Sequence, residues 1–266
     1  MSPAELHLAQ VRLAEDTGEA DKDQAENSML SGLKMALTDI KVYIFTVMTV
    51  SQLLGLSFTN FFPTLTATLG YNTTISLLLA TPPWIWATIL CCVNSFHADR
   101  SRERFFHIVG PWSGVIVGYI IAISTFSIGG RYLSLFLMAS GHAGYALSLV
   151  WVANTIARPP AKRAVAIGIV NGVGNIGSLI GSYVWKAEWG PQYHQSMEIG
   201  IASLFLSILL AFVIRYIVKR MNKQLDEDAL GALKGTNRKR IEEAARLEGI
   251  ILEEAMERKR RFRYLY

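Results

Sequence analysis

Six long apolar stretches, separated by short polar gaps, fill the middle of this 266-residue chain. A bilayer core about 30 Å thick needs roughly 20 apolar residues in each helix that spans it. Every stretch meets that length, so the pattern predicts an all-α, polytopic membrane protein with six transmembrane helices. The predicted spans are residues 42–62, 77–96, 105–126, 132–156, 164–185 and 197–218.

Lysine and arginine gather at every second gap between these spans. The second and fourth gaps and the exit after the last span are rich in basic residues, whereas the first gap has none. Arg131 is the only lysine or arginine in the third gap, and Lys186 is the only one in the fifth. By the positive-inside rule, the even gaps and both termini are expected to face the cytoplasm.

Composition excludes several other classes of protein. The net charge of +5 is no sign of nucleic-acid binding, because the basic residues stand where topology requires them. Cys91 and Cys92 are adjacent within the second span and are interpreted as small apolar fillers. No metal-ligand spacing or cofactor motif is found, and the polar, acidic first 28 residues do not resemble a signal peptide.

The chain divides into three zones. Residues 1–38 read as a cytoplasmic linker, residues 39–223 as the six-helix transmembrane part, and residues 224–266 as a charged cytoplasmic tail. The tail keeps an apolar stripe over 241–255 and ends in a basic run at 258–263. It is either a solvated helix or a segment that rests on anionic lipid, and the sequence leaves both open.

Glycines and amides distinguish the spans from simple anchors. Asn171 and Asn175 lie one helical turn apart on one face of the fifth span. An amide without partners in hydrocarbon costs several kcal/mol, so both are expected to face the bundle interior or a water-filled pathway. Glycines at four-residue spacing predict close helix packing in the third and fifth spans; they are Gly110, Gly114, Gly118, Gly168, Gly172, Gly177 and Gly181.

His142 lies in the fourth span, where ionisable groups are nearly absent, and Tyr145 follows it by one turn. It is either a proton-handling group or a neutral imidazole bonded to a backbone carbonyl. Gln52 and Asn60 in the first span are similar polar candidates. The pair Pro82-Pro83 predicts a break or a helix start in the second span.

The second gap, which carries Asp99, Arg100, Arg102 and Arg104, resembles the loop motif of major facilitator superfamily transporters. Together with three further stretches it resembles the fungal anion:cation symporter (allantoate permease) family, and region 69–104 is most similar to nicotinic acid permeases. The four stretches are Phe61-Phe62-Pro63 with Leu69-Gly70-Tyr71, then Pro82-Pro83-Trp84, then Asn94 to Arg100, then Asn154-Thr155 through Lys162-Arg163 to Gly174-Asn175-Ile176-Gly177.

This resemblance implies that the six spans form the second half of a twelve-span bundle that works by alternating access. It further implies a small organic anion such as nicotinate as substrate, protons as the coupling ion, and the plasma membrane of a fungus. In the loop motif, an acidic residue pairs with basic groups in one conformational state. The expected pathway residues are Gln52, Asn60, His142, Tyr145, Asn171 and Asn175 for hydrogen bonds, with Phe61 and Trp84 for stacking.

An enzyme is disfavoured because the spans hold no cluster of acid, base, nucleophile or metal ligands. A non-transporting membrane protein that pairs with or regulates a full-length relative is the alternative, and a half-protein that associates with itself is a third reading.

Overall fold

The computed structural model of the chain describes residues 29–233. The prediction of an all-α, polytopic membrane protein is confirmed, because this part of the chain holds six helical segments long and apolar enough to cross a bilayer. They are Ile40–Ala67, Thr73–Ser101, Phe105–Ser124, Ile128–Thr155, Pro160–Val184 and His194–Leu225. The apolar stripe and the basic run predicted in the tail lie outside the described residues.

Three spans are single helices and three are divided. The second, third and sixth are α5 (Thr73–Ser101), α6 (Phe105–Ser124) and α11 (His194–Leu233). The first consists of α3 (Ile40–Gly55), the 3₁₀ turn η1 (Ser57–Phe61) and α4 (Phe62–Ala67). The fourth is divided into α7 (Ile128–Ala139) and α8 (Gly141–Thr155), and the fifth into α9 (Pro160–Gly174) and α10 (Ile176–Val184). Two short elements, α2 (Met29–Leu37) and η2 (Ala187–Trp189), lie outside the spans.

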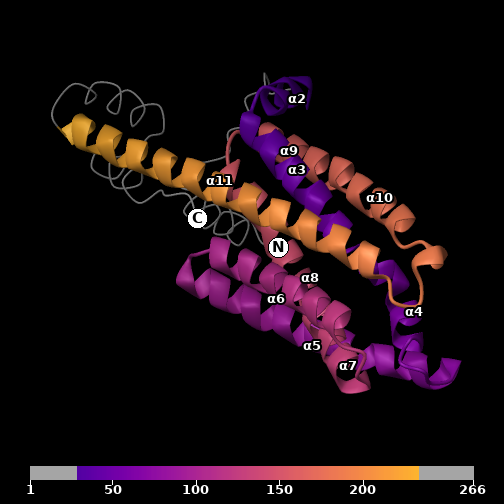
Figure 1. Ribbon diagram of the computed structural model, residues 1–266. Coiled ribbons are helices and arrows are strands. Elements are labelled where there is room, and N and C mark those ends of the chain that lie inside the picture. Colours follow the sequence, from indigo (N-terminus) through magenta and orange to yellow (C-terminus); the bar gives the residue numbers. More distant parts are fainter. Residues whose placement is uncertain (1–28, 234–266) are drawn as a thin grey trace, which may run out of the picture. The chain divides into compact units, whose positions relative to one another are not determined.

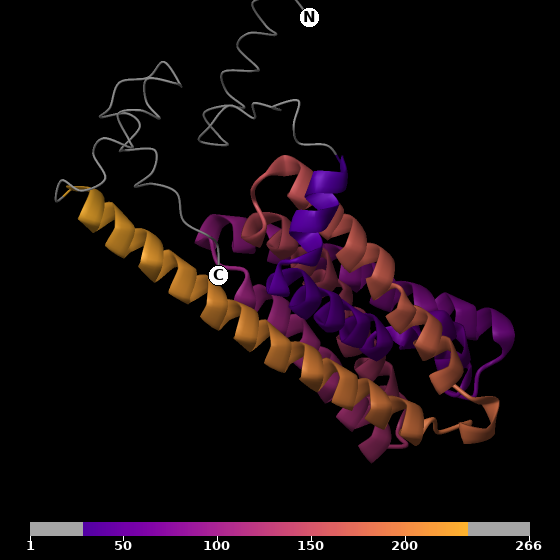
Figure 2. The same ribbon diagram turned by 90° about the horizontal axis from the view of Figure 1, so that it is seen from above.

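Residues 31–216 form one compact unit, and the described residues 29–30 and 217–233 lie outside it. Within the unit, α5, α6, α7 and α8 pack against one another, while α3 packs along α9 and α10 (Figures 1 and 2). Large buried side chains fill the interior; they include Phe45, Met48, Phe58, Trp112, Tyr119 and Trp151. The unit therefore has a packed interior like that of a soluble domain, although its outer surface is apolar.

Short polar side chains cap the starts of α3, α5 and α7. Asp39, Asn72 and Ser127 each accept a hydrogen bond from a backbone N–H in the first turn of α3, α5 and α7. Such caps satisfy backbone donors that no helical carbonyl can reach. At the other end of α5, Arg102 adopts a left-handed conformation, which terminates the helix.

The break or start predicted at Pro82-Pro83 is wrong, because α5 begins at Thr73 and runs through both prolines. A proline inside a helix removes the N–H that would bond the carbonyl four residues earlier. For Pro83 that carbonyl belongs to Leu79, and the Tyr132 hydroxyl donates to it at 3.2 Å. A side chain from another span thus replaces the missing backbone donor.

The glycines fall into two groups. Close packing is confirmed at Gly118, Gly177 and Gly181, where an added Cβ would collide with a neighbouring helix. It is wrong for Gly110, Gly114, Gly168 and Gly172, which have no atom within 4 Å of such a Cβ. Four-residue spacing marks one face of a helix, but it does not say which face meets another helix.

Candidate functional site

One side of α8 connects the polar groups of three segments. Its side chains His142, Tyr145 and Ser148 follow one another at three-residue spacing. The His142 Nε2 atom lies 3.3 Å from Thr59 Oγ1 of η1, and the Tyr145 hydroxyl donates to Asn171 Oδ1 of α9 at 3.1 Å. The Ser148 hydroxyl lies 3.3 Å from Gln52 Oε1 of α3. α8 therefore links the first, fourth and fifth spans through side-chain hydrogen bonds.

The break in the first span follows α3 directly. The turn η1 leaves the carbonyls of Gly55 and Leu56 outside the regular α-helical pattern. The Tyr119 hydroxyl donates to Gly55 O at 2.7 Å, and the Thr59 hydroxyl donates to Leu56 O at 2.8 Å. Water is absent from a bilayer core, so side chains have to satisfy such carbonyls.

The break in the fourth span frees another carbonyl. The Ala143 N–H bonds to Ser140 O at 3.1 Å rather than to the carbonyl four residues earlier, which belongs to Ala139. The His142 Nδ1 atom lies 3.3 Å from that Ala139 oxygen. His142 thus connects its own break, at Ser140, with the break in the first span.

The fifth span is divided at Asn175, whose side-chain amide donates to Asn171 O at 2.7 Å. Asn171 and Asn175 both lie on an exposed face of the unit, together with Gly168 and Gly172. The two amides therefore point away from the packed interior of residues 31–216.

The remaining predicted residues occupy different places. Gln52 is fully buried between α3 and α8, whereas Asn60 is exposed at the end of η1. Trp84 is half-buried, with its ring centroid 5.1 Å from that of His142 and 5.2 Å from that of Phe62. Phe61 stacks on Trp185, with centroids 5.7 Å apart. Trp84 and His142 thus lie together, and Phe61 belongs to a separate aromatic contact.

Sequence reasoning missed Thr59 and Ser148, which bond two of the predicted residues. Serine and threonine occur throughout the spans and often bond only their own helix, as Thr46 and Ser182 do. No pattern in the sequence sets Thr59 or Ser148 apart from them.

The loop motif between α5 and α6 forms an ion pair within itself. The Arg104 guanidinium lies 2.6 Å from Asp99 Oδ1, and the Arg104 side chain is only 7% exposed. Arg102 ends α5, and it is exposed together with Arg100. Asp99 and Arg104 of the motif are therefore paired with each other in this conformation, whereas Arg100 and Arg102 are exposed.

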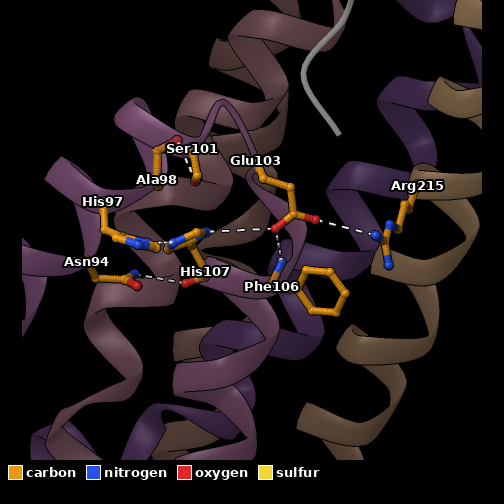
Figure 3. Close-up of polar contacts among 8 residues, drawn as sticks. All are labelled: Asn94, His97, Ala98, Ser101, Glu103, Phe106, His107 and Arg215. Atoms are coloured by element: carbon orange, nitrogen blue, oxygen red, sulfur yellow. Dashed lines mark hydrogen bonds and ion pairs between the residues drawn. The ribbon is translucent and has the colours of Figure 1, made fainter.

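A second polar network adjoins that loop (Figure 3). Glu103 Oε1 lies 3.4 Å from the guanidinium of Arg215 in α11. The guanidinium carbon of Arg215 lies over the rings of Phe105 and Phe106. Glu103 Oε2 is 3.9 Å from His107 Nδ1, and His107 Nε2 is 2.6 Å from His97 Nδ1. These contacts hold together the adjoining ends of α5 and α6 and residue 215 of α11.

An ion pair joins the start of the first span to the start of the fifth. Lys162 Nζ donates to Asp39 Oδ2 at 2.6 Å, and Lys41 Nζ lies 3.5 Å from the same oxygen. Burial alone would raise the pKa of the Asp39 carboxyl. The hydrogen bonds from Lys162 and from the Lys41 N–H, with the charges of both lysines, outweigh burial and hold that pKa below its ordinary value.

Several known proteins are similar to this chain. The MFS-type transporter cnsO of Penicillium expansum is 34% identical over 137 residues, covering 49% of this chain and 26% of that protein. The major facilitator-type transporter hxnP of Emericella nidulans is 28% identical over 198 residues, covering 73% of this chain and 39% of that protein. An uncharacterized transporter of Schizosaccharomyces pombe is 27% identical over 165 residues, and the aligned part covers 61% of this chain and 33% of that protein.

The chain thus spans between 26% and 39% of the length of these relatives. No family model and no solved structure matches it. Six apolar helical segments support an integral, multi-pass membrane protein, and the relatives that it resembles are named as transporters. Two of these relatives are named as transporters of the major facilitator type.

Proposed function

We propose that this chain supplies the second six-span half of a proton-coupled transporter for small organic anions such as nicotinate. The observation that carries this proposal is the side of α8 where His142, Tyr145 and Ser148 bond the first and fifth spans. Transporters of this kind place substrate groups at interrupted helices near the bilayer midplane. Here the His142–Thr59 contact lies at the breaks of the fourth and first spans, and Asn171 lies one turn before the break of the fifth.

The exposed amides of the fifth span supply neutral donors for a carboxylate. Asn171 and Asn175 lie on the exposed face of α9 and at its end, and Asn171 is held by Tyr145. A face with two amides and two glycines is poorly suited to lipid, because amides in hydrocarbon need partners. In the proposed complete transporter this face borders the aqueous pathway between the halves. Trp84, in contact with His142, offers an aromatic surface to a ring substrate.

The size of the native product is the first measurement. An immunoblot of source membranes with an antibody to residues 236–266 is expected to show a band near twice 29.5 kDa. A band near 30 kDa, with co-purification of a full-length relative and no uptake by the chain itself, would instead favour the non-transporting partner.

Uptake of radiolabelled nicotinate by the native product in proteoliposomes tests the site. Asn175→Leu is expected to lower uptake about tenfold or more, because one lost hydrogen bond to a charged group corresponds to that factor. Ile176→Leu, at an adjacent exposed apolar residue, is the matched control and should leave uptake unchanged. Normal uptake with unchanged affinity in Asn175→Leu would remove that residue from the site.

A further inference from the structure

Both ring nitrogens of His142 face oxygen atoms. Nδ1 lies 3.3 Å from the Ala139 carbonyl, and Nε2 lies 3.3 Å from the Thr59 hydroxyl. A carbonyl oxygen only accepts hydrogen bonds, so Nδ1 is the nitrogen that carries a proton in the neutral ring. Nε2 then accepts a hydrogen bond from the Thr59 hydroxyl when it is unprotonated, and donates one to it when it is protonated.

The Thr59 hydroxyl has one hydrogen and two neighbours that can accept it. One is the Nε2 lone pair of a neutral His142, and the other is Leu56 O at 2.8 Å. When Nε2 takes up a proton from water, it donates to Thr59 Oγ1, and the hydroxyl hydrogen is free to bond Leu56 O. When the proton leaves, the Nε2 lone pair at 3.3 Å competes with Leu56 O for the hydroxyl hydrogen and weakens that bond, while the Thr59 N–H stays 3.2 Å from Leu56 O.

Leu56 stands at the junction between α3 and η1, where the first span changes from α-helix to 3₁₀ turn. Such short 3₁₀ stretches within longer helices often mark hinges. A proton on His142 therefore changes the hydrogen bonding of the one residue at which the first span changes its helical form.

Four groups in the described part of the chain contact the ring, and all are uncharged. Phe58 and Trp84 contact it edge-on, with centroids 6.2 and 5.1 Å away, and its two nitrogens face Thr59 and Ala139. Tyr145, the titratable side chain next along α8, is bonded to Asn171. None of these contacting groups carries a charge, so an imidazolium here would lack a counter-ion among them and would be stabilised by an anion, such as the proposed substrate carboxylate, that bound beside it.

We propose that His142 is the residue that binds the coupling proton, and that Thr59 is a positioning residue that passes its protonation state to the break in the first span. This inference rests on the proposed transport function. A carboxylate and a proton that stabilise each other's binding are linked reciprocally, which is the thermodynamic requirement of symport.

Nitrogen-15 NMR of the histidine-labelled chain in nanodiscs tests the hydrogen bonding without any transport assay. The chain has five histidines, and the signal lost in His142→Asn identifies the ring. At pH 8 we expect a protonated Nδ1 and an unprotonated Nε2, and Thr59→Val should move the Nε2 resonance while Thr59→Ser should not. A protonated Nε2 in the neutral ring, or a resonance indifferent to Thr59→Val, would overturn the switch.

The pH profile of nicotinate uptake by the native product tests the coupling. We expect His142→Gln to lower uptake and remove its rise on outside acidification. Thr59→Val should reduce that rise at least threefold, and Thr59→Ser should restore it. An equal loss at every pH in both variants would contradict coupling through these residues. Absence of uptake by the wild type, with the expected NMR result, would instead count against the proposed substrate and function.

Discussion

Side chains satisfy the backbone carbonyls that the irregular parts of the spans leave free. Gly55 O, Leu79 O and Ala139 O are reached by Tyr119, Tyr132 and His142 respectively. In water a solvent molecule would serve each carbonyl, but in hydrocarbon an unsatisfied group costs several kcal/mol. The helices can therefore depart from regular α-helical geometry only where such a side-chain donor reaches the freed carbonyl.

Tyr119→Phe is expected to lower the free energy of unfolding by about 1–2 kcal/mol, because it leaves the Gly55 carbonyl without its buried donor at 2.7 Å. Unfolding in mixed micelles, followed by tryptophan fluorescence, measures the change. Tyr183→Phe is the matched control, since Tyr183 is 74% exposed. Equal stability of the two variants would mean that another group replaces the Tyr119 hydroxyl.

Asp39→Asn keeps a side-chain acceptor for the α3 cap but removes the charge that Lys162 and Lys41 contact. We expect a loss of about 1–2 kcal/mol. The folded pKa of Asp39 is lowered, so its contribution is present above the unfolded value near 4 and is lost only as pH falls through the lower folded value. The loss should therefore be the same at pH 5.5 and pH 8, and a loss that vanished at pH 5.5 would contradict this assignment.

At the scale of elements, glycines allow α9 and α10 to pack directly on α3. A Cβ at Gly174 would meet Thr49, one at Gly177 would meet the Val50 carbonyl, and one at Gly181 would meet Ser57. The fifth span also presents Gly168 and Gly172 on its other, exposed face. The sequence predicted close packing at the glycines of both faces of this span, but the faces differ because only one of them meets α3.

Gly177→Ala is expected to lower the free energy of unfolding by about 1–3 kcal/mol, because the neighbouring atom is backbone and cannot rotate away. Gly172→Ala is the matched control in the same span and should be neutral or stabilising by up to about 1 kcal/mol, since alanine favours a helix. Unfolding midpoints of the two variants provide the comparison. A neutral Gly177→Ala would show that α10 can move away from α3 at little cost.

At the scale of the whole molecule, runs of apolar residues predicted all six spans. Bilayer thickness fixes their length, and few charges interrupt them. The divisions inside three spans could not be read in the same way, because Ser140 and Asn175 are ordinary residues with helical backbone angles. For the candidate site, scarce polar residues such as His142 were visible in the sequence. Their partners Thr59 and Ser148 were not, because a hydroxyl bonds its own helix as readily as a neighbouring one.

The charge pattern predicts that the loop before α5 and the loop after it lie on opposite sides of the membrane. In a chain whose Cys91 and Cys92 are replaced by alanine, Tyr71→Cys should react with an impermeant thiol reagent in intact cells. Ser101→Cys should react only after permeabilisation, since its loop is rich in arginine. Labelling in the reverse order would invert the proposed topology.

The contact of Gly177 with the Val50 carbonyl has a mechanical consequence. It joins backbone to backbone, without a compressible side chain between the two helices. Rotating α10 by one residue would bring Ile176 or Ser178 against that carbonyl, and sliding it would do the same. α3 and α10 are therefore expected to travel as one rigid piece in any rearrangement, so that the bending falls at η1 and between this pair and the group formed by α5 to α8.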